Sequence, residues 1–185
     1  MIVSKNYFNK SFVILGLGRS GTALAEALIQ SGAKVLVWDD NPDALLAACK
    51  RGFEAFNRSK KGRWEGIDIL LVSPGVPFLH PKPHDIILEA LNAQVPIDND
   101  IGLFFSILET TKKNFKVPPK VIAVTGSNGK STTSSLIHHI LGEAGITTQF
   151  GGNIGLGVFD LKPVQNDEVI VLELSSYQLE VAQLL

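Results

Sequence analysis

Short runs of apolar residues alternate along the chain with longer segments in which apolar residues recur every three or four positions. The short runs predict buried strands, and the longer segments predict amphipathic helices. The first strand is expected at residues 12–15, and a helix is expected over residues 20–31. This alternation predicts an α/β fold in which helices cover both faces of a parallel sheet.

The same alternation continues through the first half of the chain. Further strands are expected at residues 35–38, 53–56, 67–72 and 95–97, and further helices at residues 42–50, 84–93 and 101–108. Asn41 and Pro42 are typical of a helix start. Cys49 falls on the apolar side of its predicted helix, so we expect it to be buried packing. The basic residues 58–63 are expected to form a solvated loop.

The pattern changes at residues 110–120, which contain four lysines and two consecutive prolines. Such a segment is hard to fold into a helix and is typical of a linker between domains. Later strands are expected at residues 121–124, 147–150 and 168–174. We therefore expect a first domain over residues 1–110, a linker over 111–120 and a second domain over 121–185. Because domains usually have about 100–150 residues, the second is expected to be part of a larger domain in a longer enzyme.

Composition narrows the possible functions. The chain has 185 residues, of which 45% are hydrophobic, and a net charge of −1. No apolar run approaches the roughly 18 residues of a membrane span, and the charge gives no reason to expect a nucleic-acid or membrane surface. Cys49 is the single cysteine, which excludes an intramolecular disulfide. We expect a cytoplasmic protein.

The strongest chemical signal lies at residues 121–132, where four apolar residues precede Thr-Gly-Ser-Asn-Gly-Lys-Ser-Thr. Backbone N–H groups of such a turn and the following helix N-terminus form a cradle for phosphate. Lys130 adds a positive charge, and the hydroxyl of Ser131 is suited to bind Mg²⁺. Val124 replaces the first glycine of the usual motif, so this is a variant loop. The candidate nucleotide-binding residues are Gly126, Ser127, Asn128, Gly129, Lys130, Ser131 and Thr132.

A second glycine-rich turn, Gly16-Leu-Gly-Arg-Ser-Gly21, follows the first predicted strand and opens a helix. Asp39 stands 18 residues after Gly21, where an acid would meet a ribose hydroxyl. This pattern fits a nicotinamide cofactor, but its glycines would equally admit the diphosphate of a UDP-sugar. A purely structural turn is the remaining alternative.

Two further motifs follow buried strands. Ser73-Pro-Gly-Val76 should border the same crevice as the first glycine turn, because both leave the carboxyl edge of the sheet. An ordinary Pro-Gly turn is the alternative. Glu173 ends the last predicted strand beside two serines, and in phosphate-loop enzymes an acid on a neighbouring strand helps to hold Mg²⁺. The alternative is a carboxylate on an edge strand that faces water.

Three motifs together resemble one family: Thr125-Gly-Ser-Asn-Gly-Lys-Ser-Thr132, Gly151-Gly-Asn-Ile-Gly155 and Leu172-Glu-Leu-Ser-Ser-Tyr-Gln-Leu-Glu180. With them, the chain resembles the Mur ligases of peptidoglycan synthesis over essentially its whole length, and most of all the members that add D-glutamate. Folylpolyglutamate synthetases share the Gly-Lys loop but do not usually carry Ser-Ser-aromatic-Gln-Leu. Asp100-Ile-Gly-Leu-Phe104 is also similar to this family, which often has Glu in place of Gly102.

The resemblance implies a Rossmann-like first domain for UDP-N-acetylmuramoyl-L-alanine and a P-loop second domain for ATP and Mg²⁺. It implies Lys130 and Glu173 as catalytic residues and Ser131 and Glu173 as metal ligands. The substrate-binding residues that it implies are Gly18, Arg19, Ser20, Asp39, Asp40, Ser73, Gly75 and Asn153. D-Glutamate is the implied second substrate, and a monomer is the implied state of the full-length enzyme.

The implied reaction is ATP-dependent amide formation through an acyl phosphate. The family's downstream metal-binding histidine, modified lysine and C-terminal domain have no counterpart in these residues, so we expect no turnover by this chain alone. Two other hypotheses remain open: a nicotinamide-dependent oxidoreductase and a non-catalytic nucleotide-binding module.

Overall fold

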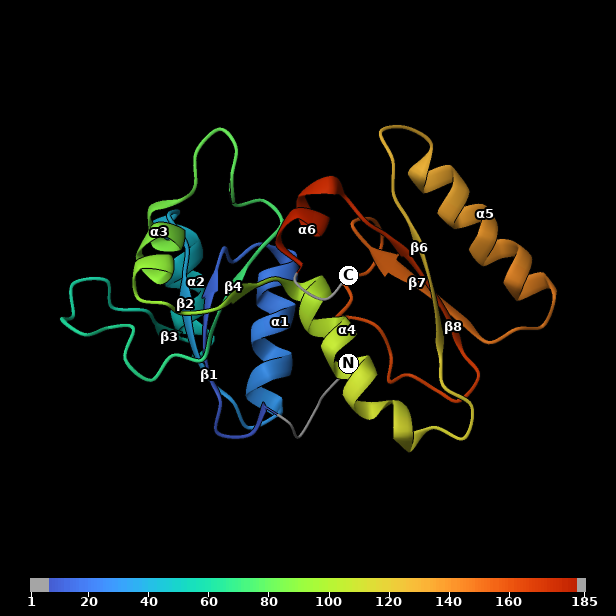
Figure 1. Cartoon of the computed structure of the whole chain (residues 1–185), viewed down its shortest axis with the longest axis horizontal. Coiled ribbons are helices and arrows are strands. Elements are labelled where there is room, and N and C mark those ends of the chain that lie inside the picture. Colours follow the sequence, from blue (N-terminus) through green and yellow to red (C-terminus); the bar gives the residue numbers. More distant parts are fainter. Residues whose placement is uncertain (1–6, 183–185) are drawn as a thin grey trace.

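The computed structural model describes residues 7–182 and distributes their strands over two parallel sheets (Figure 1). The first sheet has the order β3-β2-β1-β4-β5 and the second the order β6-β8-β7. The strands are β1 (Ser11–Leu15), β2 (Lys34–Trp38), β3 (Glu54–Ala55), β4 (Ile69–Val72), β5 (Ile97–Asp98), β6 (Lys120–Val124), β7 (Thr148–Gly152) and β8 (Val169–Glu173). The predicted α/β class with parallel sheets is confirmed.

Helices follow most of the strands, as the apolar pattern predicted. They are α1 (Arg19–Gln30), α2 (Pro42–Lys50), α3 (Asp85–Asn92), α4 (Asp100–Thr111), α5 (Lys130–Glu143) and α6 (Ser176–Val181). Strand β5 begins at Ile97, two residues later than the predicted start at residue 95.

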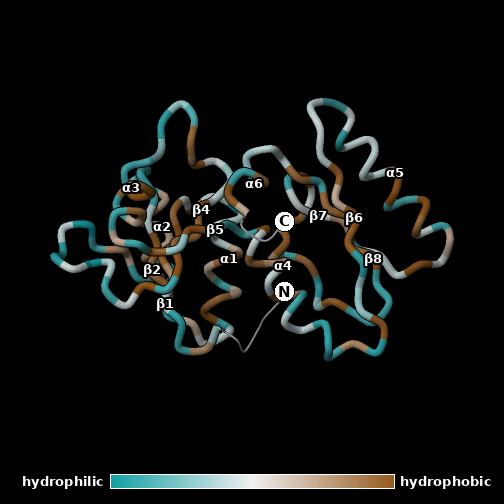
Figure 2. The backbone as a smooth tube through the Cα atoms, in the orientation of Figure 1, coloured by the Kyte–Doolittle hydropathy of each residue, from teal (hydrophilic) through white to brown (hydrophobic). Residues whose placement is uncertain are grey.

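The central strand β1 is buried on both faces, and the alternation of its side chains divides the core in two. Phe12 and Ile14 pack with α1 and α4 on one face, whereas Val13 and Leu15 pack with α3 on the other. Apolar colour accordingly runs along β1 and β2 in Figure 2. This double burial fits the continuous apolar runs of a parallel sheet.

Helix α4 lies between the two sheets (Figure 1). Its buried residues, such as Phe104 and Ile107, belong to the same apolar cluster as Leu24 of α1 and Ile170 and Leu172 of β8. The two sheets are therefore joined by a shared core.

The prediction that residues 110–120 resist helix formation is wrong for their first part. Helix α4 runs to Thr111, and a 3₁₀ turn, Lys112–Asn114, follows it. The hydroxyls of Thr110 and Thr111 donate to backbone oxygens of the preceding turn, at 2.9 Å to Ser106 and 2.7 Å to Ile107. Burial of the other face of α4 outweighs the weak helix propensity of these residues.

The prediction that Cys49 is buried packing is also wrong, because its side chain is exposed. In α2 the preceding residue, Ala48, faces the core instead. Neighbouring helical residues point about 100° apart around the axis. Because Ala48 faces the core, the thiol of Cys49 faces the surface.

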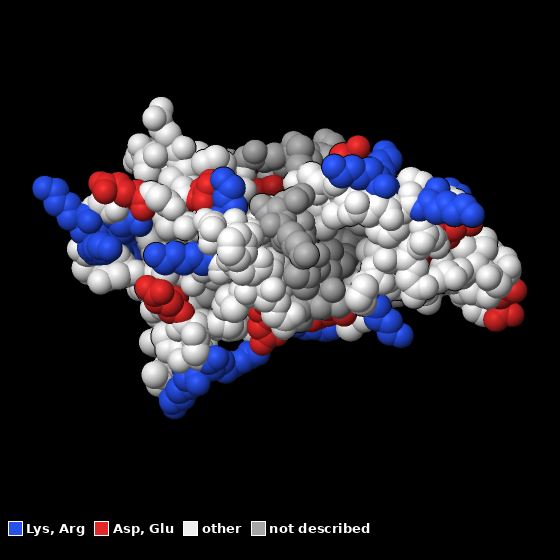
Figure 3. Space-filling model, turned by 90° about the horizontal axis from the view of Figure 1, so that it is seen from below, with Lys and Arg blue, Asp and Glu red and all other residues white. Residues whose placement is uncertain are grey.

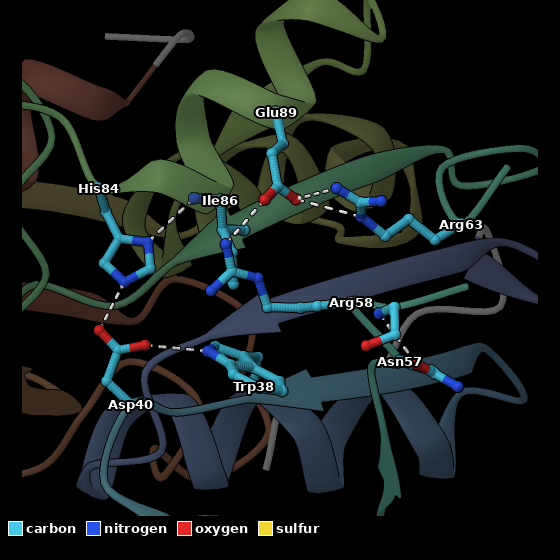
Figure 4. Close-up of polar contacts among 9 residues, drawn as sticks. Trp38, Asp40, Asn57, Arg58, Arg63, His84, Ile86 and Glu89 are labelled. Carbon is cyan, nitrogen blue, oxygen red and sulfur yellow. Dashed lines mark hydrogen bonds and ion pairs between the residues drawn. The ribbon is translucent and has the colours of Figure 1, made fainter. Parts of the chain in front are cut away.

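The basic loop 58–63 is not simply solvated. Both Arg58 and Arg63 bond to the carboxylate of Glu89 in α3, at 2.7 and 3.0 Å. Arg58 also lies over the ring of Trp38, 5.4 Å from its centroid (Figure 4). Burial raises the pKa of Glu89, but the hydrogen bonds from the two arginines outweigh it and hold the pKa below its ordinary value.

The surface offers no single-sign face in the view of Figure 3, where acidic and basic side chains are interspersed. Within residues 7–182, no helix is both long and apolar enough to cross a membrane.

Candidate functional site

A cavity of about 510 Å³ opens at the carboxyl edge of the first sheet. Ligands of open parallel sheets bind at this edge, where loops from neighbouring strands meet. All eight predicted substrate-binding residues line the cavity: Gly18, Arg19, Ser20, Asp39, Asp40, Ser73, Gly75 and Asn153. Their convergence from four separate segments is a result of the fold, and their role in binding stays a prediction.

The two glycine-containing loops of the first sheet border the same cavity, as predicted, and they also contact each other. The hydroxyl of Ser73 donates to the backbone oxygen of Gly16 at 2.7 Å. Gly16 has a φ of +94°, and a Cβ atom there would lie 2.9 Å from Cβ of Ser73. Gly21 is closer still, because its Cβ would lie 2.0 Å from the oxygen of Gly16. Only glycine, which has no Cβ atom, permits the two loops to approach this closely at either position.

Asp39, which directly follows β2, stabilises the first glycine loop through hydrogen bonds. Its carboxylate accepts hydrogen bonds from the backbone N–H of Leu17 at 2.6 Å and from that of Asn41 at 2.8 Å. Both oxygens thus hold the protein backbone while the residue lines the cavity. The acid predicted to meet a ribose therefore also fixes the loop's shape.

Asp40 joins a network that the sequence did not predict (Figure 4). Its carboxylate accepts from Nε1 of Trp38 at 3.0 Å and contacts Nε2 of His84 at 2.7 Å. The hydrogen bonds from Trp38 and His84 lower the pKa of Asp40. Nδ1 of His84 accepts from the backbone N–H of Ile86 at 3.1 Å, so the geometry fits a neutral ring that donates through Nε2.

His84 lines the cavity but was not among the predicted site residues. It reaches Asp40 across 44 residues of sequence, and no local motif marks such a pair. The one feature that could have drawn attention to His84 is its position as the N-cap of α3.

The opposite wall of the cavity comes from the second sheet and its helix α6, through Asn153 and Gln178. The side-chain amide of Asn153 donates to Oε1 of Glu173 at 3.2 Å, and its backbone N–H donates to the oxygen of Glu173 at 2.7 Å. Asn153 therefore connects the cavity to the carboxyl end of β8. Gln178 was also missed as a site residue, although it lies within the motif at residues 172–180.

The predicted phosphate loop joins β6 to α5. Gly126 has a φ of +143°, and Gly129, the N-cap of α5, has a φ of +74°. These are backbone conformations that favour glycine. Nζ of Lys130 donates to the oxygen of Gly126 at 2.7 Å, so the lysine lies back over its own loop. Residues 125–129 are exposed and accessible to a ligand.

Glu173 stands beside the start of this loop, because it pairs with Val124 in the register of β6 and β8. Its side chain is only 1% exposed. Within residues 7–182, Oε2 of Glu173 is buried without a hydrogen-bond partner. A buried carboxylate oxygen without a partner is costly, and a cation beside the loop would satisfy it.

No group of three or more His, Cys, Asp or Glu side chains that could hold a metal ion occurs in the described part of the chain. The buried carboxylate of Glu173 is a ligand type that fits Mg²⁺, which is usually bound by one or two protein ligands together with phosphate oxygens and water. Ser131 and Glu173 as its ligands stay a prediction.

Comparisons with known proteins show which proteins the chain is similar to. Residues 124–185 match the family described as Mur ligase middle domain. The chain is 50% identical over its whole length to the UDP-N-acetylmuramoylalanine--D-glutamate ligase of Cereibacter sphaeroides and 52% identical to that of Ruegeria pomeroyi, and it covers 40% of each. The protein of the same name from Roseobacter denitrificans is 50% identical over 99% of the chain.

The chain thus spans about 40% of the length of the curated relatives that it matches. The matched region includes the phosphate loop and Glu173, and the relatives extend the similarity over the cavity. On this evidence, residues 124–185 match the Mur ligase middle domain, and the whole chain is similar to about 40% of the length of these ligases.

Proposed function

We propose that this chain provides the nucleotide-binding parts of an ATP-dependent ligase that adds D-glutamate to UDP-N-acetylmuramoyl-L-alanine. The UDP substrate binds in the cavity at the first sheet, whose lining comes mostly from the domain predicted over residues 1–110. ATP binds at residues 126–132, within the domain predicted over residues 121–185. Mg²⁺, held by Ser131 and Glu173, would offset the charge of the phosphates.

The observation that carries this proposal is a cavity with walls from both units, which Asn153 and Glu173 connect to the predicted phosphate loop. Two glycine-containing loops line one wall, and Asn153 lines the other. Asn153 in turn hydrogen-bonds to Glu173, which neighbours the phosphate loop. A substrate that extends from the glycine loops past Asn153 would bring its far end towards the ATP site.

The reaction needs this proximity. A carboxylate is a poor acyl donor until it carries a good leaving group. In the proposed reaction, an oxygen of the substrate's alanyl carboxylate attacks the γ-phosphorus of ATP, and ADP leaves. The amine of D-glutamate then attacks the acyl phosphate carbon, inorganic phosphate leaves, and the nitrogen loses a proton. Lys130 balances the negative charge that gathers at the transferred phosphate.

Calorimetric titration of the 185-residue chain tests the proposal against its main alternative. UDP-N-acetylmuramoyl-L-alanine and NADH are titrated separately, each with competition by UDP. We expect saturable binding of the UDP compound alone, with displacement by UDP. Binding of NADH alone, without competition by UDP, would favour the oxidoreductase hypothesis and overturn the proposal.

Lys130→Ala tests the ATP site. Hydrogen bonds from a charged group contribute about 1.5–3 kcal/mol, so we expect the affinity for Mg-ATP to fall about tenfold or more. The affinity for UDP-N-acetylmuramoyl-L-alanine should stay unchanged, because Lys130 does not line the cavity. Both affinities are measured by calorimetry.

Lys120→Ala is the matched control. It removes the same charge from the opposite end of β6, where the Lys120 side chain is 71% exposed and lies 3.6 Å from Asp167. Affinity for Mg-ATP should be that of the wild type. Equal losses in the two variants would mean that net charge, rather than the position of Lys130, governs binding.

A further inference from the structure

The wall of the cavity formed by Gln178 is held in place by the start of α4. Nδ2 of Asn99 donates to the backbone oxygen of Gln178 at 2.6 Å. Oδ1 of the same Asn99 accepts from the backbone N–H of Gly102 at 2.9 Å and so caps α4. One buried side chain therefore serves as a helix cap and as a tie to α6.

A second tie involves the side chain of Gln178. Its Oε1 accepts from the backbone N–H of Ser175 at 3.0 Å, within the capping box of α6. Burial raises the pKa of Asp100, the first residue of α4, and a hydrogen bond with the side chain of Gln178 lowers it in part. Asn99, Asp100 and Gln178 are 1%, 4% and 2% exposed. Asn99 and Gln178 are hydrogen-bonded to each other across the junction between the two units.

These hydrogen bonds differ from the apolar contacts around α4. Apolar packing is non-directional, whereas a buried hydrogen bond has a narrow range of distance and angle. A small shift of α6 against α4 would leave buried polar groups without partners, at the full cost of their desolvation. The polar ties therefore favour one placement of α6.

That placement matters to the cavity because α6 is rigidly connected to the rest of the second wall. Only Leu174 and Ser175 separate α6 from Glu173, the last residue of β8. Glu173 is bonded to Asn153 through both backbone and side chain. Fixing Gln178 therefore fixes Asn153 relative to the glycine loops on the opposite wall.

We propose that Asn99 forms a latch on Gln178 and acts as a positioning residue for a ligand that extends across the cavity. This inference rests on the proposed function, since it takes a UDP-sugar as the ligand. A diphosphate at the first glycine loop needs only the first wall. The sugar and its alanyl group need the second wall, so their binding depends on the latch.

Asn99→Ser separates the two roles of Asn99. Serine caps helices about as well as asparagine, but its shorter side chain does not reach Gln178. Calorimetry with the full chain is expected to show about a tenfold loss of affinity for UDP-N-acetylmuramoyl-L-alanine, equal to one hydrogen bond of about 1.4 kcal/mol. The affinity for UDP is expected to stay the same.

Two further variants serve as controls. Asn41→Ser makes the same change at the N-cap of α2, where the side chain accepts from the backbone N–H of Asp43 and lies outside the cavity lining. It should bind both compounds as the wild type does. Asp100→Asn changes the neighbouring buried position without removing the hydrogen bond from Asn99 to Gln178, so it should retain the preference for the longer ligand.

Hydrogen exchange on the unmodified chain gives a measurement that does not depend on how a variant folds. Amides of residues 176–181 should gain protection with UDP-N-acetylmuramoyl-L-alanine and gain none with UDP. Equal protection by both ligands overturns the latch. An Asn99→Ser variant overturns it too if it binds both compounds as the wild type does, or if its affinity for both falls equally. A wild-type chain that binds neither compound overturns the proposed function, and the latch with it.

Discussion

Gly21→Ala is expected to separate the two glycine-containing loops and to weaken binding in the cavity. Its Cβ atom would lie 2.0 Å from the oxygen of Gly16 and 2.5 Å from Oγ of Ser73, the two atoms joined by the bond between the loops. Gly16 is buried and Ser73 is partly buried, and both belong to short connections, so one loop must move. Overpacking of this kind costs about 1–3 kcal/mol, and the broken hydrogen bond adds about 1 kcal/mol.

The displaced loops would no longer present their backbone to a diphosphate. We therefore expect Gly21→Ala to lower the affinity for UDP-N-acetylmuramoyl-L-alanine by more than about tenfold and to lower the urea midpoint of unfolding. Calorimetry and urea denaturation measure the two effects.

Gly142→Ala is the control for this substitution. It lies in α5, is exposed, and its Cβ atom would meet nothing within 4 Å. Alanine there should stabilise the chain by up to about 1 kcal/mol without changing affinity for the UDP compound. A Gly21→Ala protein with wild-type affinity and stability would show that the contact between Gly21 and Gly16 does not shape the cavity.

Features that depend on local pattern and sheet topology could be predicted from the sequence. The apolar run at residues 12–15 identifies a buried strand, and parallel strands bring their carboxyl ends to one edge. This rule is enough to place Gly16, Ser73 and Asp39 around one cavity. The glycine conformations at Gly126 and Gly129 likewise follow from the local motif.

Features that depend on pairing between distant loops could not be predicted. His84 meets Asp40, and Arg58 meets Glu89, across 44 and 31 residues of sequence. No periodicity or motif relates the members of these pairs, since the fold alone brings them together. The tie from Asn99 to Gln178 spans 79 residues and was missed for the same reason.

Asp100→Asn is expected to gain stability relative to the wild type as the pH rises from acid to neutral. Burial raises the pKa of Asp100 to about 6, in spite of hydrogen bonds from the backbone N–H groups of Ile101 and Asp100 and from the side chain of Gln178. The nearby carboxylate of Asp98 raises this pKa further. The folded chain therefore binds the Asp100 proton more tightly than the unfolded chain, whose carboxyl has the ordinary pKa of 3.8.

The sign and size of the effect follow from proton linkage. The stability that this proton provides is fully present below about pH 4 and is lost as the pH rises through about 6. Since each pKa unit corresponds to about 1.4 kcal/mol, ionised Asp100 costs the fold about 3 kcal/mol at neutral pH. Asparagine does not ionise. The unfolding free energy of Asp100→Asn minus that of the wild type should therefore rise by about 3 kcal/mol between pH 4 and pH 7.

Urea denaturation of both proteins across this range measures the difference, and titrations common to both cancel. Asp85→Asn is the matched control, because Asp85 holds the same first position in α3 but is exposed. Its difference from the wild type should stay within about 1 kcal/mol, the usual size of an interaction with the helix dipole. A flat difference for Asp100→Asn would mean that the buried carboxylate ionises at no cost. A rise of this size would show that burial of ionised Asp100 destabilises the folded chain at neutral pH.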